Sequence, residues 1–392
     1  MIRVGVVGFG LAGRVFHAGV VNAVEGLELA AIVQRTGSTA GEAYPNLPIL
    51  RSVDELLRDS TIRLVVVATP NDSHFRIARQ CLLADRDVVV DKPFALDDTE
   101  AAELIQLARA RGRLLSVYQN RRWDGDFRTV RTLLGSGRLG RLVSYESHFD
   151  RYRPEPNLSA WRDSGGPGGG ILFDLGSHLI DQALVLFGRP NAIWAQVRKE
   201  RKGARIDDAF DLLLQYQARA PGRRTEDRQD EPSQFGAPKF GAPGSGNPRS
   251  DVPGLGVSGP NVWLRATCIA RDPGPRFSLN GTQGTFRKFG LDPQEDRMRA
   301  GDIFQSTPWG DDPEELWGVL TEDVNGRPVS NRIPTEPGDY RGYYANVRDA
   351  LLGLARLEVQ PVEAWRTMRI LEAALESSER GCVLSCDWSR EP

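Results

Sequence analysis

The fold follows from a glycine-rich stretch near the N-terminus, Gly8-Phe9-Gly10-Leu11-Ala12-Gly13. The apolar run Ile2 to Val7 comes directly before it, and a helical pattern over Ala12 to Val24 comes after it. In such a strand–turn–helix setting the first glycine permits the turn, the second lets phosphate approach the backbone, and the third allows close packing. Amide groups at the start of the helix add hydrogen-bond donors and positive potential. The stretch therefore predicts a dinucleotide-binding unit.

Outward from this unit, strand and helix patterns alternate as far as about Gln119. Further strands are expected at Leu27 to Val33, Leu64 to Ala68, Asp87 to Val90 and Leu114 to Tyr118. A helix is expected over Thr99 to Arg111, with Asp98 as its cap. This repetition is typical of a parallel, doubly wound sheet, and we predict a Rossmann domain of the α/β class over residues 1–120.

Beyond residue 120, long alternating strands with few helices predict a second domain. We expect an α+β domain over residues 121–392 with a large, mostly antiparallel or mixed sheet. Residues 219–260 fit neither domain, since this stretch is rich in Pro, Gly, Ser, Asp and Arg. Such a composition buries too little apolar surface to offset the entropy of ordering. We interpret it as a disordered insertion at the tip of a lengthened hairpin.

Composition excludes several classes of partner. The formal net charge of -2 gives no electrostatic case for binding nucleic acid or an anionic membrane. No apolar run is long enough to span a bilayer, and no signal segment precedes the first strand. The four cysteines are scattered without the histidines that a zinc site needs, so we expect no metal and a reduced, cytoplasmic protein.

The end of the second predicted strand reports on the cofactor. An acid about 20 residues past the glycines would bind the ribose 2′-hydroxyl of NAD. This chain has Gln34 and Arg35 there instead, with Ser38 close by. A guanidinium can pair with a 2′-phosphate as a planar fork, so the residues favour NADP, with NAD as the alternative. The competing interpretation is that Arg35 is a solvated surface residue.

Three ordered motifs carry a family resemblance. They are Ala68-Thr69-Pro70-Asn71-Asp72-Ser73-His74, then Asp91-Lys92-Pro93, then Gly170-Ile171-Leu172-Phe173-Asp174-Leu175-Gly176-Ser177-His178. Together they resemble the glucose–fructose oxidoreductase, inositol dehydrogenase and rhizopine-catabolism (Gfo/Idh/MocA) family. Residues 119–124 and 290–295 resemble its NADP-dependent scyllo-inositol dehydrogenases. One departure is Asp91, because the family usually has Glu there, and the shorter side chain puts the placement of Lys92 in doubt.

The resemblance implies hydride transfer between a nicotinamide cofactor and a polyol or sugar such as an inositol. It also implies a homodimer or homotetramer, which a large sheet with one uncovered face would favour. The alternatives are a sugar or aldose reductase of the same family, glycosidase chemistry through transient oxidation, or a dinucleotide-sensing regulator without catalysis. Retention of Lys92, Asp174 and His178 together argues against a regulator.

These three residues suit alcohol oxidation. The base should titrate near neutral pH, as His178 does when unperturbed. Asp174 lies four residues earlier, so on a helix it shares a face with His178 and can hydrogen-bond the imidazole or the adjacent substrate hydroxyl. Lys92 follows the fourth strand, where an ammonium can stabilise the developing alkoxide. From the residues alone, a structural role for His178 is as good an interpretation as a catalytic role. The family resemblance favours the catalytic role.

The remaining expectations concern binding. The expected cofactor contacts are Gly8, Phe9, Gly10, Leu11, Ala12, Gly13, Gln34, Arg35, Ala68, Thr69, Pro70, Asn71, His74, Lys92, Asn120, Trp161 and Arg162. The expected substrate contacts are Lys92, Asn120, Arg121, Asp174 and His178. Asn71 and His74 are expected to line the nicotinamide ribose, although His74 also suits a purely structural place at a helix start. His17, on the first helix, is as readily packed as functional.

Overall fold

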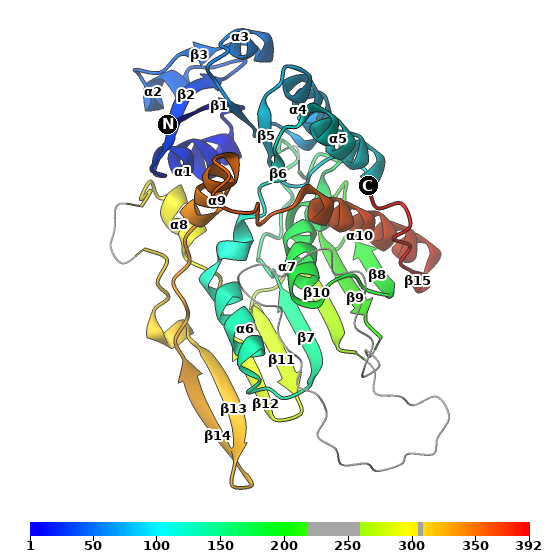
Figure 1. Cartoon of the computed structure of the whole chain (residues 1–392). Helices are drawn as coiled ribbons and strands as arrows, with labels where there is room; N and C mark the ends of the chain where they lie inside the picture. The colour runs from blue at the N-terminus through cyan, green and yellow to red at the C-terminus, as the bar shows by residue number, and fades with distance from the viewer. Residues whose placement is uncertain (161, 218–258, 305–308) are drawn as a thin grey trace.

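The computed structural model describes residues 1–160, 162–217, 259–304 and 309–392. Figure 1 shows two sheets, a smaller one formed by the N-terminal part of the chain and a larger one below it. Trp161 and all but the last two residues of the predicted insertion 219–260 lie outside the described residues.

The first sheet has six parallel strands in the order β3-β2-β1-β4-β5-β6. The strands are β1 (Ile2–Val7), β2 (Leu27–Val33), β3 (Ile49–Leu50), β4 (Leu64–Val67), β5 (Asp87–Val90) and β6 (Leu115–Val117). Every residue of β4 and β5 is buried, as expected of central strands with helices on both faces. The predicted doubly wound parallel sheet is confirmed.

Helices cover both faces of this sheet. They are the π-helical η1 (Ala12–Ala18), which continues into α1 (Gly19–Asn22), then α2 (Thr39–Ala43), α3 (Val53–Leu57), η2 (Asn71–Ser73), α4 (His74–Leu83) and α5 (Asp98–Arg111). One predicted cap is wrong: the side chain of Asp97, not Asp98, accepts the Glu100 amide at 2.8 Å. Asp97 has the extended backbone that a cap needs, whereas Asp98 is buried and pairs with Arg369 at 3.3 Å.

The second sheet has nine strands in the order β14-β13-β12-β11-β7-β10-β9-β8-β15. They are β7 (Leu142–His148), β8 (Ala192–Arg198), β9 (Ala209–Gln215), β10 (Asn261–Thr267), β11 (Phe277–Gly281), β12 (Gly284–Lys288), β13 (Gly318–Val324), β14 (Arg327–Ile333) and β15 (Leu384–Ser385). Only β10 and β7 pair in parallel, so the sheet is mixed as predicted. Antiparallel pairing of β9 with β10 confirms the hairpin on either side of the predicted insertion.

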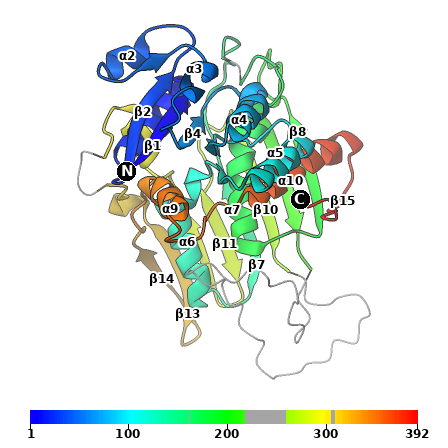
Figure 2. The same cartoon turned by 45° about the horizontal axis from the view of Figure 1, so that its top comes forward.

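The helices that follow the first domain tie the two sheets together. They are η3 (Asn120–Trp123), α6 (Gly125–Ser136), η4 (Leu172–Gly176), α7 (Ser177–Phe187), α8 (Gln294–Arg299), η5 (Glu314–Leu316), α9 (Arg341–Leu351) and α10 (Pro361–Arg380). Both α7 and α10 pack on the larger sheet, and α10 also lies against α5, as Figures 1 and 2 show. In contrast, α9 packs on α1, and its Tyr343 and Tyr344 join the core of the first sheet. This packing places the start of α7 below the carboxyl edge of the first sheet.

In the described part of the chain, we find no helix with the length and apolar character needed to cross a bilayer.

Candidate active site

The glycine turn leaves room for a ligand. Gly8 has a φ of +101°, and a Cβ there would lie 2.5 Å from the Ala68 carbonyl oxygen. A Cβ on Gly13 would lie 2.0 Å from the Gly8 carbonyl oxygen, so both positions require glycine. In contrast, a Cβ on Gly10 would meet no atom within 4 Å. The backbone is therefore open at the point where the sequence predicts a pyrophosphate, and these residues fit a dinucleotide.

The loop after β2 is braced by Gln34. Its side-chain oxygen accepts the Ala40 amide at 2.8 Å, and its side-chain nitrogen donates to the Thr39 hydroxyl at 2.9 Å. These bonds turn Gln34 inward, while Arg35 is exposed beside it. Among the described residues, Arg35 has no ion-pair partner. The predicted position of Arg35 at the carboxyl edge of the sheet is thus accessible to a ligand.

His74 does not line a ribose, which corrects that expectation. Its side chain is fully buried, and its two ring nitrogens lie 2.9 Å from the Pro93 carbonyl oxygen and 2.8 Å from the Thr69 carbonyl oxygen. The ring therefore joins the loop after β4 to the loop after β5, which carries Lys92. Asn71 is also nearly buried, and its amide nitrogen donates to the Gly168 carbonyl oxygen at 2.7 Å.

Lys92 and Asp174 form the centre of the site. The Lys92 ammonium lies 2.9 Å from Asp174 Oδ1 and 2.8 Å from the backbone oxygen of the same residue. Arg162 Nε donates to the same Oδ1 at 3.2 Å. Of the two hydrogen bonds considered for Asp174, the one to the imidazole of His178 is not formed among the described residues, and the two cations bind Oδ1 of the carboxylate instead. Asp174 thus orients Lys92 rather than His178.

His178 follows on α7 and is only 5% exposed. Its Nδ1 is buried, with no hydrogen-bond partner among the described residues. Burial lowers the pKa of His178 well below its usual value, and the charges of Lys92 and Arg121 lower it further, against the opposing effect of Asp174. Burial would raise the pKa of Asp174, but Lys92, Arg162 and Arg151 together hold it far below its usual value. At neutral pH the site therefore holds a carboxylate beside a neutral imidazole.

The loop before Asp174 needs glycine. Gly170 has a φ of +84°, and a Cβ there would lie 2.1 Å from Asp207 Oδ1. The other oxygen of the Asp207 carboxylate accepts the Leu172 amide at 2.8 Å. Asp207 thereby fixes the start of η4, the turn that carries Asp174 into the site.

Behind Lys92, Asp91 accepts the Lys92 amide at 2.8 Å and lies 3.7 Å from His17 Nε2. Burial would raise the pKa of Asp91, but its interactions with His17 and Lys92 keep it below the usual value. His17 is fully buried and bonds the Tyr344 hydroxyl at 2.7 Å, so its packed interpretation holds. Although Asp91 is shorter than the Glu usual in the family, its carboxylate therefore still accepts a hydrogen bond from the backbone amide of Lys92.

Asn120 and Arg121 lie on η3, at the end of β6. Asn120 is 6% exposed, and within the described ranges its side chain forms no hydrogen bond. Arg121 pairs with Asp124 at 3.3 Å and with Glu295, and its guanidinium lies 4.8 Å from the centre of the Phe149 ring. Arg121 is thus largely committed to protein contacts, whereas the side-chain amide of Asn120 forms no hydrogen bond in the described part of the chain.

Arg151 is a residue that the sequence analysis missed. It follows β7, and its amide donates to the Thr267 carbonyl oxygen at 2.9 Å. Burial lowers the pKa of Arg151, while Asp174 and Glu295 favour its charged form. Within the described residues its guanidinium has no ion-pair partner. A half-buried cation without a partner beside Asp174 is a candidate substrate contact, and nothing in the local pattern of residues 149–153 distinguishes it from its neighbours.

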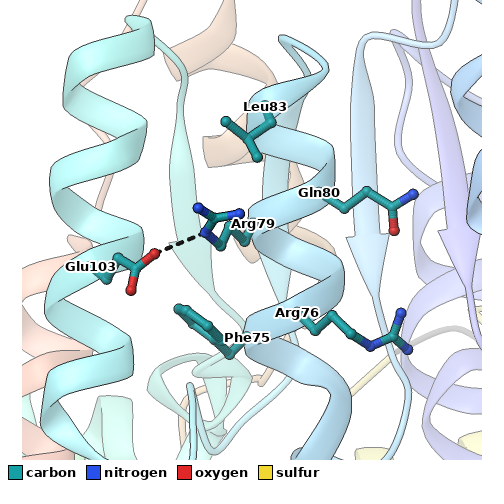
Figure 3. A pocket seen from close by; sticks show the side chains of 6 residues that line it. All are labelled: Phe75, Arg76, Arg79, Gln80, Leu83 and Glu103. Atoms are coloured by element: carbon teal, nitrogen blue, oxygen red, sulfur yellow. Dashed lines mark hydrogen bonds and ion pairs between the residues drawn. The ribbon is translucent and has the colours of Figure 1, made fainter.

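The hollow drawn in Figure 3 is a different place. It measures about 450 Å³ and lies between α4 and α5, lined by Phe75, Arg76, Arg79, Gln80, Leu83 and Glu103. Arg79 and Glu103 close one side with a 2.8 Å ion pair. No predicted site residue lines it, so it is not part of the site at the strand ends.

Comparison with known proteins agrees with this geometry. Residues 2–119 match the model of the oxidoreductase family with an NAD-binding Rossmann fold. Residues 127–228 match the GFO/IDH/MocA C-terminal domain, and residues 260–384 match the C-terminal alpha/beta domain of the oxidoreductase family. The chain belongs to the Gfo/Idh/MocA oxidoreductase family.

Two curated relatives and one solved structure span nearly the whole chain. The uncharacterized oxidoreductase YdgJ of Escherichia coli is 37% identical, with 98% of each chain covered. The scyllo-inositol 2-dehydrogenase (NADP(+)) IolW of Bacillus subtilis is 32% identical, over 96% of this chain and 94% of the relative. The crystal structure of an oxidoreductase from Bacillus cereus is 28% identical with a TM-score of 0.80, and 99% of each chain is covered.

Proposed function

We propose that this oxidoreductase is an NADP-preferring dehydrogenase that oxidises a secondary hydroxyl of a polyol or sugar, such as an inositol. One observation carries the proposal. The Lys92 ammonium is held by two hydrogen bonds to Asp174, and next to this pair lies the neutral imidazole of His178, whose Nδ1 has no hydrogen-bond partner among the described residues. The similarity to a dehydrogenase whose substrate is scyllo-inositol supports the substrate class.

Each residue has a separate task in this mechanism. The neutral His178 accepts the hydroxyl proton, since burial and nearby cations keep its ring unprotonated. Lys92 donates a hydrogen bond to the oxygen on which negative charge develops. Asp174 holds the ammonium in place through its carboxylate and its backbone oxygen. NADP⁺, when bound, supplies the hydride acceptor.

The preference for NADP rests on Arg35. It is exposed at the carboxyl end of β2, where NAD-dependent Rossmann domains place an acid. A charge-assisted contact to a 2′-phosphate is worth roughly 1.5–3 kcal/mol, or about one to two decades in affinity. Arg35→Ala should therefore weaken NADP binding much more than NAD binding. Equal affinity of the unaltered chain for both would contradict the preference.

One assay tests the activity. A panel of inositols, aldoses, ketoses and sugar acids is incubated with NADP⁺ or NAD⁺ and, for the reverse reaction, with NADPH or NADH, and the absorbance of the reduced nicotinamide is followed. Turnover of a polyol with NADP⁺ is expected. Turnover only of aldoses or ketoses with NADPH would instead favour the reductase reading, and cofactor binding without any turnover would favour a regulator.

We also propose that the protein is a cytoplasmic homodimer or homotetramer that binds neither nucleic acid nor membrane. All four cysteines are free thiols, in keeping with a reducing compartment. The assembly would form through the face of the larger sheet that α7 and α10 leave uncovered.

A further inference from the structure

Arg51 lies beside the loop that carries Arg35. Strand β3 pairs in parallel with β2, with Val33 opposite Leu50, and the Gln34 amide donates to the Leu50 carbonyl oxygen at 2.9 Å. Arg51 is the next residue, so it leaves the same carboxyl edge of the sheet at the level of Gln34. The strand order therefore brings together two arginines that are 16 positions apart in the sequence.

The side chain of Arg51 holds this loop through only one of its nitrogens. NH1 donates to the carbonyl oxygens of Gln34 and Gly37, at 2.9 Å in each case. These two bonds span Arg35, and Gly37 has a φ of +84° that completes the turn. Within the described residues, Nε and NH2 of Arg51 have no hydrogen-bond partner. They remain available to an acceptor outside the chain.

Two arginines at this loop have no ion-pair partner in the described part of the chain. Arg51 and Arg35 are both exposed, and across the described ranges neither forms an ion pair. Two carboxylates are close, but both have donors of their own. Glu55 accepts the Arg51 amide at 3.0 Å and the Ser52 hydroxyl at 3.1 Å, and Glu42 accepts the Ser38 hydroxyl.

We infer that Arg51 is the second cation of a phosphomonoester site on this loop. NH1 fixes the turn that presents Arg35, and the free N–H groups of Arg51 bind the 2′-phosphate of NADP together with Arg35. The inference rests on the proposed use of NADP. Arg51 would then be a second determinant of cofactor choice. It follows β3, whereas the glycine motif follows β1 and Arg35 follows β2.

Calorimetric titration of the full chain with NADP⁺ and with NAD⁺, without substrate, tests the inference. The variants are Arg51→Ala and Arg51→Gln, the second keeping an amide donor but no charge. Arg58→Ala is the matched control, since Arg58 is exposed at the other end of α3. Both Arg51 variants should lose about ten-fold or more in NADP⁺ affinity while NAD⁺ affinity and the melting temperature stay unchanged. The control should match the unaltered chain.

Two results would overturn the inference. One is an Arg51→Gln chain that keeps the full preference for NADP⁺. The other is an equal loss of affinity for both nucleotides, which would show that Arg51 makes no contribution specific to the 2′-phosphate. An unaltered chain without any preference would contradict the proposed cofactor, and the inference with it. A preference that depends on Arg51 in a chain that oxidises no polyol would support the inference and contradict only the proposed reaction.

Discussion

Lys92 and Asp174 are joined twice, because the ammonium donates both to the Asp174 carboxylate and to the backbone oxygen of the same residue. Arg162 donates to the same oxygen of the carboxylate, Oδ1, and within the described residues no hydrogen bond joins Asp174 to His178. The site therefore separates two functions that a hydrogen-bonded Asp–His pair would combine: a fixed cation on one side and an unpaired neutral imidazole on the other.

The first prediction concerns turnover. His178→Ala and Lys92→Ala should each lower kcat by about 10²–10⁴-fold with little change in NADP⁺ affinity, since both residues act in the transition state. Asp174→Asn should fall between these variants and the unaltered enzyme or below them, because the neutral amide can accept a hydrogen bond from the ammonium but forms no ion pair with it. Steady-state kinetics and calorimetry measure both quantities. A His178→Ala enzyme with near-normal kcat would remove His178 from the mechanism.

The second prediction concerns pH. Because the pKa of His178 lies well below its usual value of about 6.5, the imidazole stays neutral in mildly acidic solution. The rate of alcohol oxidation should therefore hold its plateau below pH 6.5, and its acid limb should appear only at lower pH. The pH profile of kcat/KM measures this limb, because it reports the groups of the free enzyme, and His178→Ala should abolish the limb. A limb centred at or above the usual histidine value would contradict a buried neutral base.

The same shift affects stability. A histidine whose pKa is lower in the folded state binds its proton first in the unfolded chain. His178 therefore destabilises the fold as pH drops through about 6.5, and it has no such effect above that pH. Chemical denaturation at several pH values measures this effect. As pH falls below about 6.5, the free energy of unfolding should decrease less in His178→Gln than in the unaltered chain.

The third prediction concerns His74. Its two ring nitrogens face backbone carbonyl oxygens on two loops, that of Thr69 before α4 and that of Pro93 after Lys92. Burial lowers the pKa of His74, so the ring is neutral and its single N–H donates to one of these oxygens while the ring packs between both loops. His74→Phe should lower the free energy of unfolding by about 2–4 kcal/mol and should also lower kcat/KM, because Lys92 loses its support. The exposed Arg76→Ala, two positions along the same helix, is the control. If His74→Phe has the same free energy of unfolding as the unaltered chain, the ring does not join the two loops.

The sequence was sufficient for the fold, and its motifs named Lys92, Asp174 and His178 as candidates for the site. Unbroken apolar runs such as Leu64 to Ala68 and the glycine turn are local patterns, and local patterns survive in a single sequence. Lys92, Asp174 and His178 could be proposed together because each lies in a motif with a family resemblance. The choice between Asp97 and Asp98 as a cap was missed, because two adjacent acids differ only in backbone conformation.

Other site features depend on contacts between distant segments. The burial of His74 results from carbonyls on two loops, and nothing in the order of residues 68–74 shows where Pro93 lies. Arg51 reaches Gln34 only because β3 pairs beside β2, and the two-residue strand β3 is too short to be predicted from the sequence pattern. Arg151 is singled out only by its partly buried guanidinium, which has no ion-pair partner among the described residues, and this cannot be seen in the sequence.

The fourth prediction concerns Arg151. Its partly buried guanidinium helps to lower the pKa of Asp174, and it has no ion pair in the described part of the chain. We expect it to contact oxygens of the substrate, so Arg151→Ala should raise KM for the best polyol about ten-fold or more, with a smaller change in kcat. Arg153→Ala, two residues away, is the control. An unchanged KM would show that Arg151 serves only the electrostatics of Asp174.

The last prediction concerns assembly. On the face of the larger sheet opposite α7 and α10, Trp194 and Trp263 meet edge to face with ring centres 6.1 Å apart. Arg265 stacks on Trp263 at 4.8 Å and pairs with Asp211 at 3.1 Å, so the charges on this face are largely balanced within the sheet. A half-exposed aromatic pair with internally balanced charges is suited to burial against a second copy of the same face.

Light scattering at micromolar concentration should therefore give a dimer or tetramer for the unaltered chain. Trp263→Glu places a charge in the expected interface and should give a monomer with unchanged secondary structure by circular dichroism. Leu354→Glu is the matched control, because Leu354 is 74% exposed after α9, away from this sheet, and its variant should keep the assembly. A monomeric unaltered chain would contradict the prediction outright. An assembly that tolerates Trp263→Glu would show that the copies meet through some other surface.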